Sequence, residues 1–220
     1  MTEVQRLPKI VLAASIVGGV SYMAQPLLNL PDAIVLAWKG SGVALLAAYA
    51  ALRASGRDGW MIAAVMAFGA LGDVLLNAFG LTVGAVAFLI GHLVAVALYW
   101  AHRRQDLTRG QLISGALMIP AIAVTAFELP ADRAFAPGVA LYATGLAAMA
   151  ATAWMSRFPR ALVGLGALAF VVSDLLIFAR SGPLAHDALA AAAIWPLYYG
   201  GQLAICLGVT RTLARDAAAI

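Results

Sequence analysis

The sequence predicts an all-α integral membrane protein, a bundle of eight transmembrane helices. Of its 220 residues, 64% are hydrophobic and 11% are charged, and the mean hydropathy is +0.93. A soluble domain has about 25% charged residues. Apolar runs of roughly 20 residues recur along the whole chain, each long enough to cross about 30 Å of hydrocarbon as a helix. The strands of a membrane β-barrel would alternate in shorter segments.

The apolar segments follow one another in order, separated by short polar connections. Charged residues, glycine or proline interrupt the apolar runs in "RASGRDG", "HRRQDLTRG", "ELPADRAFAP", "SRFPR" and "RSGPLAHD". The predicted helices are residues 8–24, 33–52, 59–79, 82–102, 109–127, 135–155, 160–180 and 188–212. No segment is left over for a soluble domain, so we expect residues 1–220 to form a single polytopic membrane domain.

The formal charge of +4 marks topology rather than nucleic-acid binding. Eleven Lys and Arg residues lie at the two ends of the chain and in the even-numbered loops, whereas only Arg133 and Arg180 lie in odd-numbered loops. By the positive-inside bias, both termini are expected in the cytoplasm. Twelve arginines against two lysines, with many alanines, indicate a GC-rich bacterial genome. We therefore expect a multi-pass protein of the bacterial cytoplasmic (inner) membrane.

Two other features have simple interpretations. Residues 1–24 have a charged start and an apolar run, as a signal peptide does, but the run continues into "VSYMAQP" without a clear small-residue cleavage site. We interpret this segment as the first transmembrane helix. The single Cys206 cannot form an internal disulfide and is expected to be a small buried apolar residue.

Charged residues inside the apolar segments need a specific reason, because an ionisable group in hydrocarbon costs several kcal/mol unless it faces the bundle interior, a partner or water. Three residues qualify: Lys39, Asp73 and Asp174. Softer polar residues at membrane depth join them: Asn77, His92, Tyr142, Tyr198, Tyr199 and Gln202.

The predicted topology brings these groups to similar depths. Asp73 and Asp174 each lie about 14 residues into an outward-running helix, at about 1.5 Å per residue. Lys39 lies about six residues into an inward-running helix, at a similar level. Tyr142 is close to that depth, and His92 and the Tyr198–Gln202 turn lie nearer the midplane. We expect one polar layer, drawn from six helices.

Structural roles remain as alternatives for each candidate. Asp73 has Asn77 one turn away as a hydrogen-bonding partner, and Asp174 has Ser173 beside it. Lys39 is long enough to reach the outer interface. His92 shares a helix face with Tyr99 and suits an interhelical contact. The three tyrosines suit packing or interface anchoring, and Pro196 suits a kink in the last helix.

Several other chemistries are excluded by residue counts. A zinc hydrolase needs about three ligands at one depth, but His102 and His186 fall in loops on opposite faces, which leaves only His92. The sequence has no glycine-rich phosphate loop, no G-x-S-x-G motif and no C-x-x-C motif. We expect no metal and no organic cofactor.

The segments "GDVLL" (72–76), "FLIGHLVAVALYW" (88–100), "SDLLI" (173–177) and "PLYYGGQLAI" (196–205), with a lysine early in the second helix, resemble the YhhN-type membrane family, which includes lysoplasmalogenases. The resemblance implies a bundle of about eight helices that cleaves the vinyl ether bond of lysoplasmalogens. The products are a fatty aldehyde and glycerophospho-ethanolamine or -choline.

The resemblance also indicates site residues. It implies that Asp73 and Asp174 are catalytic and that Lys39, His92, Tyr198 and Gln202 line the site. Family members usually have a proline after the lysine of the second helix, whereas this chain has Gly40. The expected partners are the lysophospholipid substrate and membrane lipid.

Vinyl ether hydrolysis begins with protonation of the alkene carbon and passes through an oxocarbenium ion that water captures. It needs an acid and a nearby negative charge. A carboxyl group in an apolar cavity can hold a proton near neutral pH, and two close carboxyl groups separate into one protonated and one ionised. We expect Asp73 and Asp174 to divide these roles. The alternatives are a proton-coupled transporter and a non-catalytic lipid-binding protein.

Overall fold

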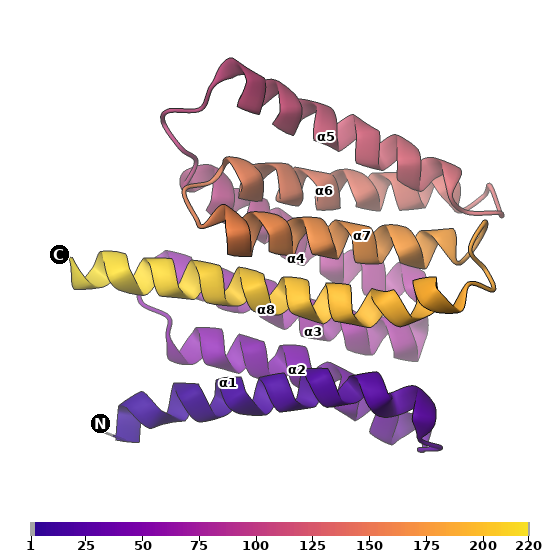
Figure 1. Ribbon diagram of the computed structural model, residues 1–220, viewed down its shortest axis with the longest axis horizontal. Helices are drawn as coiled ribbons and strands as arrows, with labels where there is room; N and C mark the ends of the chain where they lie inside the picture. Colours follow the sequence, from indigo (N-terminus) through magenta and orange to yellow (C-terminus); the bar gives the residue numbers. More distant parts are fainter. Residues whose placement is uncertain (1–2, 220) are drawn as a thin grey trace. The chain divides into compact units, whose positions relative to one another are not determined.

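The computed structural model describes residues 3–219, and this part of the chain is almost entirely helical (Figure 1). Within it, eight helices are long and apolar enough to cross a membrane. Among the described residues the only extended pairing is an isolated antiparallel bridge between Arg103 and Ser156. The predicted fold class, an all-α multi-pass membrane protein with eight transmembrane helices, is confirmed.

The chain forms two compact units. Unit 1 comprises Met1–Ala95 with Cys206–Ile220, and unit 2 comprises Val96–Ile205. The helices α4 (Leu81–Ala101) and α8 (Ala188–Ala218) each contribute to both units. A single membrane domain and cytoplasmic termini stay predictions.

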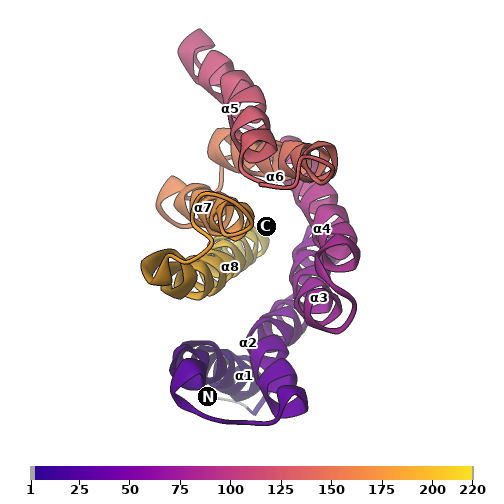
Figure 2. The ribbon, with the colours of Figure 1, turned by 90° about the vertical axis from the view of Figure 1, so that its right-hand side faces the viewer.

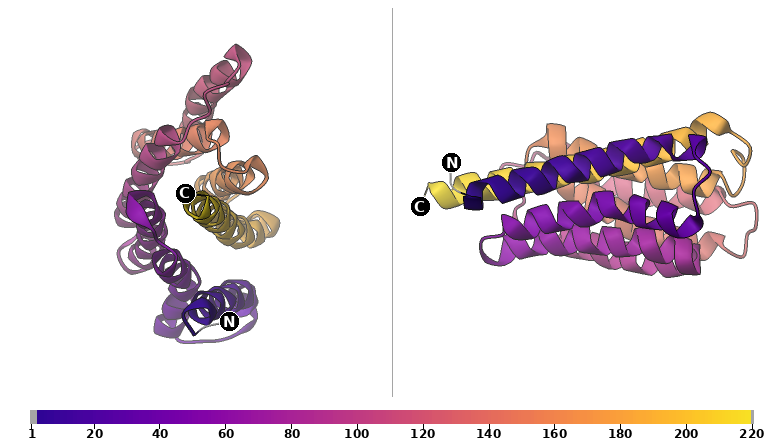
Figure 3. Two further views of the ribbon diagram at one scale, coloured as in Figure 1. Left: turned by 90° about the vertical axis from the view of Figure 1, so that its left-hand side faces the viewer. Right: turned by 90° about the horizontal axis from the view of Figure 1, so that it is seen from below.

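Unit 1 is built from α1 (Glu3–Ser21), the 3₁₀ turn η1 (Tyr22–Leu27), α2 (Asp32–Leu52), α3 (Gly56–Phe79) and most of α4. The turn η1 reverses the chain, so that α1 and α2 lie side by side and run in opposite directions (Figure 3). Ser15 joins them, because its buried hydroxyl donates to the carbonyl oxygen of Gly42 at 2.6 Å. Helix α2 also packs along α3.

Glycines allow α3 and α4 to approach closely. A Cβ added to Gly72 would lie 2.7 Å from the ring of Phe88, and one added to Gly84 would lie 2.6 Å from Cβ of Leu76. The two helices are joined by Gly80 alone, whose φ of 90° is a conformation that favours glycine. Small residues at such contacts are the usual device for packing helices in lipid.

Unit 2 contains α5 (Arg109–Glu128), α6 (Ala136–Met155), the π-helical turn η2 (Arg160–Gly164), α7 (Leu165–Ala179) and the first part of α8. Thr108 begins α5 with a capping box, exchanging hydrogen bonds with Gln111. Helix α6 contacts both α5 and α7 (Figure 2). Gly166 and Gly201 bring α7 and α8 together, because a Cβ on Gly201 would lie 2.6 Å from the carbonyl oxygen of Gly166.

The helix boundaries differ from the predicted ones mainly at the two ends of the chain. Helix α1 begins at Glu3 instead of residue 8, and α8 continues to Ala218 instead of ending at residue 212. Hydropathy reports the apolar part of a helix, whereas Arg, Leu and Ala favour helix beyond the membrane as well. Pro196 lies inside α8, as predicted. Cys206 is fully buried, with its thiol 3.8 Å from the carbonyl oxygen of Leu46.

The glycine contact between α7 and α8 generates a prediction. Gly201→Ala should destabilise the protein by about 1–3 kcal/mol, because the added methyl group meets backbone that has little room to move. The matched control is Gly200→Ala, since a Cβ at Gly200 meets nothing within 4 Å. Thermal unfolding in detergent measures both. Equal melting temperatures for the two variants would contradict the close packing described here.

Candidate functional site

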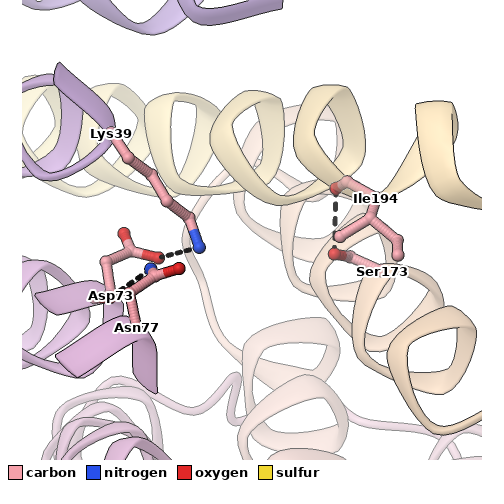
Figure 4. Close-up of polar contacts among 5 residues, drawn as sticks. All are labelled: Lys39, Asp73, Asn77, Ser173 and Ile194. Atoms are coloured by element: carbon pink, nitrogen blue, oxygen red, sulfur yellow. Dashed lines mark hydrogen bonds and ion pairs between the residues drawn. The ribbon is translucent and has the colours of Figure 1, made fainter. Parts of the chain in front are cut away.

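Unit 1 holds an ion pair at membrane depth. The Lys39 ammonium of α2 lies 3.8 Å from Oδ1 of Asp73 on α3, and Figure 4 shows the two side chains directed at each other. The exposed fraction is 18% for the Lys39 side chain and 4% for that of Asp73. Lys39, which was expected to line the site or to reach the outer interface, therefore has an aspartate as its partner.

Close helix packing surrounds this ion pair. Gly40, next to Lys39, faces Val74, and a Cβ at Gly40 would lie 3.3 Å from Cγ2 of that residue. Gly72, next to Asp73, faces Phe88 of α4. Gly40 and Gly72, which flank the ion pair, thus allow α2 and α4 to pack closely against α3. Gly40, where the resemblance led us to expect a proline, is compatible with a lysine that reaches Asp73.

Asn77 forms a hydrogen bond with Asp73, one turn before it on α3. Its side-chain amide donates to the backbone carbonyl oxygen of Asp73 at 2.8 Å (Figure 4). The Asn77 amide thus bonds within α3, to the residue one turn before it. This bond fixes the end of α3 around Asp73 and is a structural contact rather than a bond to the carboxylate.

Tyr22 joins this cluster and was missed in the sequence analysis. It lies in η1 and interacts electrostatically with Asp73. Its ring packs edge-on against Trp38 at 5.8 Å, and the indole N–H of Trp38 donates to the hydroxyl of Ser21 at 3.0 Å. The segment "VSYMAQP" contained the signal, a tyrosine at the end of an apolar run, but Tyr22 lies in the first apolar segment, outside the six helices of the expected polar layer.

His92 is buried on α4, with 4% of its surface exposed. It lies four residues after Phe88, on the same helix face. Because the Phe88 ring packs against Gly72, this face of α4 is turned towards α3. The position agrees with a histidine beside the Asp73 helix and equally with an interhelical contact.

Unit 2 holds the second carboxyl group. The Tyr142 hydroxyl of α6 donates to Oδ2 of Asp174 on α7 at 2.5 Å, and Asp174 is 6% exposed. The Tyr142 ring also packs edge-on against Phe178, one turn after Asp174, at 5.9 Å. Tyr142 was predicted to lie near the depth of Asp174, and the structure brings the two side chains together.

The Ser173 hydroxyl donates its hydrogen bond to α8 rather than to the neighbouring Asp174. Its hydroxyl donates to the backbone carbonyl oxygen of Ile194 in α8 at 3.0 Å (Figure 4). Ile194 lies two residues before Pro196, where the helix lacks one backbone N–H donor. Ser173 thus links α7 to the part of α8 that the proline alters, and it holds the two helices together beside Asp174.

The other predicted residues of α8 form a buried aromatic cluster in unit 2. The Tyr198 ring packs on Phe170 of α7 at 5.1 Å, and Trp195 contacts both Tyr198 and Tyr199. Gln202 is 2% exposed and follows Gly201, where α8 touches α7. Tyr198, Tyr199 and Gln202 are buried, and their part in a site stays a prediction. So does the single polar layer expected from six helices.

Comparisons with known proteins place this geometry in context. The YhhN family model matches residues 34–209, which include every predicted site residue but not Tyr22. Two curated relatives, from Mycobacterium bovis and Mycobacterium tuberculosis, are both named lysoplasmalogenase. Each is 32% identical over 182 residues, which cover 78% of this chain and 69% of the relative. No solved structure matches significantly. The resemblance found in the sequence is confirmed, and the relatives' names support the prediction of an enzyme of this kind.

The Lys39–Asp73 contact generates a prediction about stability. Lys39→Met should lower the melting temperature, because a buried carboxylate then loses its cation. Asp73→Asn, added to Lys39→Met, should recover part of the loss, so that the two changes are non-additive by about 0.5–3 kcal/mol.

The matched control is the Arg133–Glu128 pair, which lies at 3.6 Å with side chains 48% and 68% exposed. Arg133→Gln and Glu128→Gln should be close to additive, as exposed pairs contribute little. Thermal unfolding in detergent measures both cycles. Additivity at Lys39 and Asp73 would show that their contact does not stabilise the fold.

Proposed function

We propose that this chain, which belongs to the YhhN family, hydrolyses the vinyl ether bond of lysoplasmalogens, a class of lysophospholipid. The observation that carries the proposal is a pair of buried carboxyl groups, Asp73 and Asp174, in a membrane protein whose curated relatives are named lysoplasmalogenase. The products would be a fatty aldehyde and glycerophospho-ethanolamine or -choline. The bacterial relatives support the cytoplasmic membrane as its location.

The chemistry requires one proton donor and one anion. A proton is added to the alkene carbon that is not bonded to oxygen, which leaves an oxocarbenium ion. Water then adds to the cationic carbon and loses a proton, giving a hemiacetal. The bond between the hemiacetal carbon and the glycerol oxygen then breaks while the hemiacetal hydroxyl proton passes to that oxygen, and the aldehyde and the alcohol separate. The proton used in the first step is returned in the second, so the enzyme is unchanged.

The partners of the two aspartates favour a division of roles. Asp73 forms an ion pair with Lys39, and an ion-paired carboxylate is the group that stabilises a developing positive charge. Asp174 accepts a hydrogen bond from Tyr142. A carboxylic acid can accept such a bond and still donate its own proton. We therefore assign the anion to Asp73 and the proton donor to Asp174.

Other residues have supporting parts in this proposal. Tyr142 orients the Asp174 carboxyl group, and Lys39 holds the Asp73 carboxylate in place. His92 would tune Asp73 from α4, and the aromatic residues Tyr198 and Tyr199 would border the hydrocarbon chain of the substrate, with Gln202 beside them. That both aspartates serve one site is the expectation drawn from their equal depth in the sequence.

Substitution of the aspartates tests the proposal. Asp73→Asn and Asp174→Asn preserve side-chain size, so the protein should fold while vinyl ether turnover falls by about 10² or more, the scale of acid–base catalysis. The double variant should be little worse than either single variant, because residues acting as one unit are not additive.

The matched control is Glu128→Gln, which removes an exposed carboxylate and should leave turnover unchanged. Turnover is measured as aldehyde release in detergent, alongside the melting temperature. A well-folded Asp73→Asn or Asp174→Asn protein with wild-type turnover would remove that aspartate from the mechanism and leave it a structural role.

A further inference from the structure

Two polar connections of unit 2 are held together by backbone hydrogen bonds. They are residues 102–108, between α4 and α5, and residues 156–159, between α6 and η2. The Arg104 N–H donates to the carbonyl oxygen of Met155 at 3.1 Å, and the Arg157 N–H donates to that of His102 at 2.8 Å. These bonds form the antiparallel bridge of Arg103 with Ser156. We call these two connections, with Arg109 and Arg160 at their ends, the arginine bridge.

The arginine bridge is strongly basic. It contains five arginines and a single acidic residue, Asp106. Part of this set is fixed in place by contacts. The Arg104 Nε donates to the carbonyl oxygen of Ser156 at 2.9 Å, and the Arg157 Nε donates to Nδ1 of His102 at 3.0 Å. The guanidinium groups are therefore held by a rigid pair of connections rather than by one mobile loop.

Aromatic rings place these guanidinium groups at the level of a membrane interface. Arg103 lies over the ring of Trp100 at 5.2 Å, and Arg160 lies over the ring of Trp154 at 5.6 Å. Trp is enriched where the hydrocarbon meets the lipid headgroups. Both tryptophans lie in the last turns of membrane-spanning helices, α4 and α6. The arginines beside them therefore lie at headgroup level, where the phosphates of lipids are found.

One guanidinium nitrogen of Arg160 lacks a hydrogen-bond acceptor among the described residues. Its Nε donates to the carbonyl oxygen of Trp154 at 3.2 Å. Its Nη2 is buried, and no hydrogen-bond partner for that atom lies within the described residues 3–219. A buried guanidinium nitrogen without a partner carries a substantial desolvation cost. An oxygen atom from outside the chain would remove this cost.

We propose that the arginine bridge binds the phosphate of an anionic phospholipid headgroup. Arginine suits this ligand, because its planar fork donates two parallel hydrogen bonds to phosphate oxygens. Arg160 supplies the donor that lacks a partner in residues 3–219, and the exposed Arg103 and Arg157 supply further positive charge. Asp174 lies 14 residues after Arg160 along η2 and α7, roughly 20 Å at 1.5 Å per residue. The lipid site is therefore separate from the Asp174 carboxyl group, and the inference does not depend on the proposed hydrolysis.

A lipid titration tests this inference. Purified full-length protein in a neutral detergent is titrated with phosphatidylglycerol, with phosphatidylcholine, or with inorganic phosphate at the same phosphate concentration. The melting temperature is recorded, because a ligand that binds the folded state raises it with concentration. Phosphatidylglycerol should raise the melting temperature, and the other two should have little effect. Equal stabilisation by phosphatidylcholine, or stabilisation by inorganic phosphate alone, would overturn the assignment.

Variants localise the effect. Arg157→Gln with Arg160→Gln should weaken the apparent affinity for phosphatidylglycerol by about tenfold or more, the scale of losing charge-assisted hydrogen bonds. Arg160→Lys alone should also weaken the affinity for phosphatidylglycerol, because lysine keeps the charge but lacks the planar fork. The control is Arg211→Gln with Arg215→Gln, which removes two exposed charges from α8.

A second variant covers the case in which loss of Arg160 prevents folding. Arg103→Gln with Arg157→Gln changes only exposed side chains and should also weaken the response to phosphatidylglycerol. A wild-type affinity for phosphatidylglycerol in every folded variant of the arginine bridge would contradict a lipid site there. So would an equal loss of affinity in the Arg211→Gln, Arg215→Gln control.

Discussion

The cost of placing a carboxylate in hydrocarbon is the constraint on which unit 1 depends. Asp73 meets it with the ammonium of Lys39 from the neighbouring helix, 3.8 Å away and largely out of solvent. A partner at that distance requires α2 to lie close against α3, and Gly40 beside Lys39 permits this approach. Gly72 does the same for α4 on the other flank. The glycines next to the ion pair therefore permit the close helix packing that the ion pair requires.

Unit 2 meets the same constraint with a hydrogen bond. Asp174 lies on α7 and is held by the hydroxyl of Tyr142 on α6, the preceding long helix, as Asp73 is held from α2. In both cases the aspartate follows a small residue, Gly72 or Ser173, and its partner lies on another helix. The partners differ in charge, however. A charged partner suits an aspartate that stays an anion, and a neutral partner suits one that exchanges a proton, which is why the proposed mechanism gives the two residues different tasks.

Hydropathy was sufficient to predict the membrane-spanning segments, because a helix in lipid must bury about 20 apolar residues wherever it lies in the chain. The same signal failed at the end of α8, where residues 213–218 remain helical after the apolar run has ended. Hydropathy reports whether a segment prefers lipid or water, so it does not report how far a helix continues in water.

The site was predictable only in part. Sequence position gives the depth of a residue along a helix, so Asp73, Lys39, Asp174 and Tyr142 could be assigned to one level. It does not give the direction in which a helix faces its neighbours, so the contacts of Lys39 with Asp73 and of Tyr142 with Asp174 required the fold. Asn77 was expected to form a hydrogen bond with Asp73, and the fold shows that its amide donates to the backbone carbonyl oxygen of that residue.

Cleavage of a vinyl ether by this protein is best tested by the chemistry of its substrate. Purified protein in detergent is incubated with a lysoplasmalogen and, separately, with the analogue whose alkyl ether is saturated, and released aldehyde is measured. Detergent removes the two compartments that a transporter needs, so turnover reports chemistry alone. The account predicts aldehyde from the vinyl ether and none from the saturated ether, which has no alkene carbon to protonate. Absence of aldehyde from the vinyl ether with well-folded protein, or equal cleavage of both lipids, would contradict it.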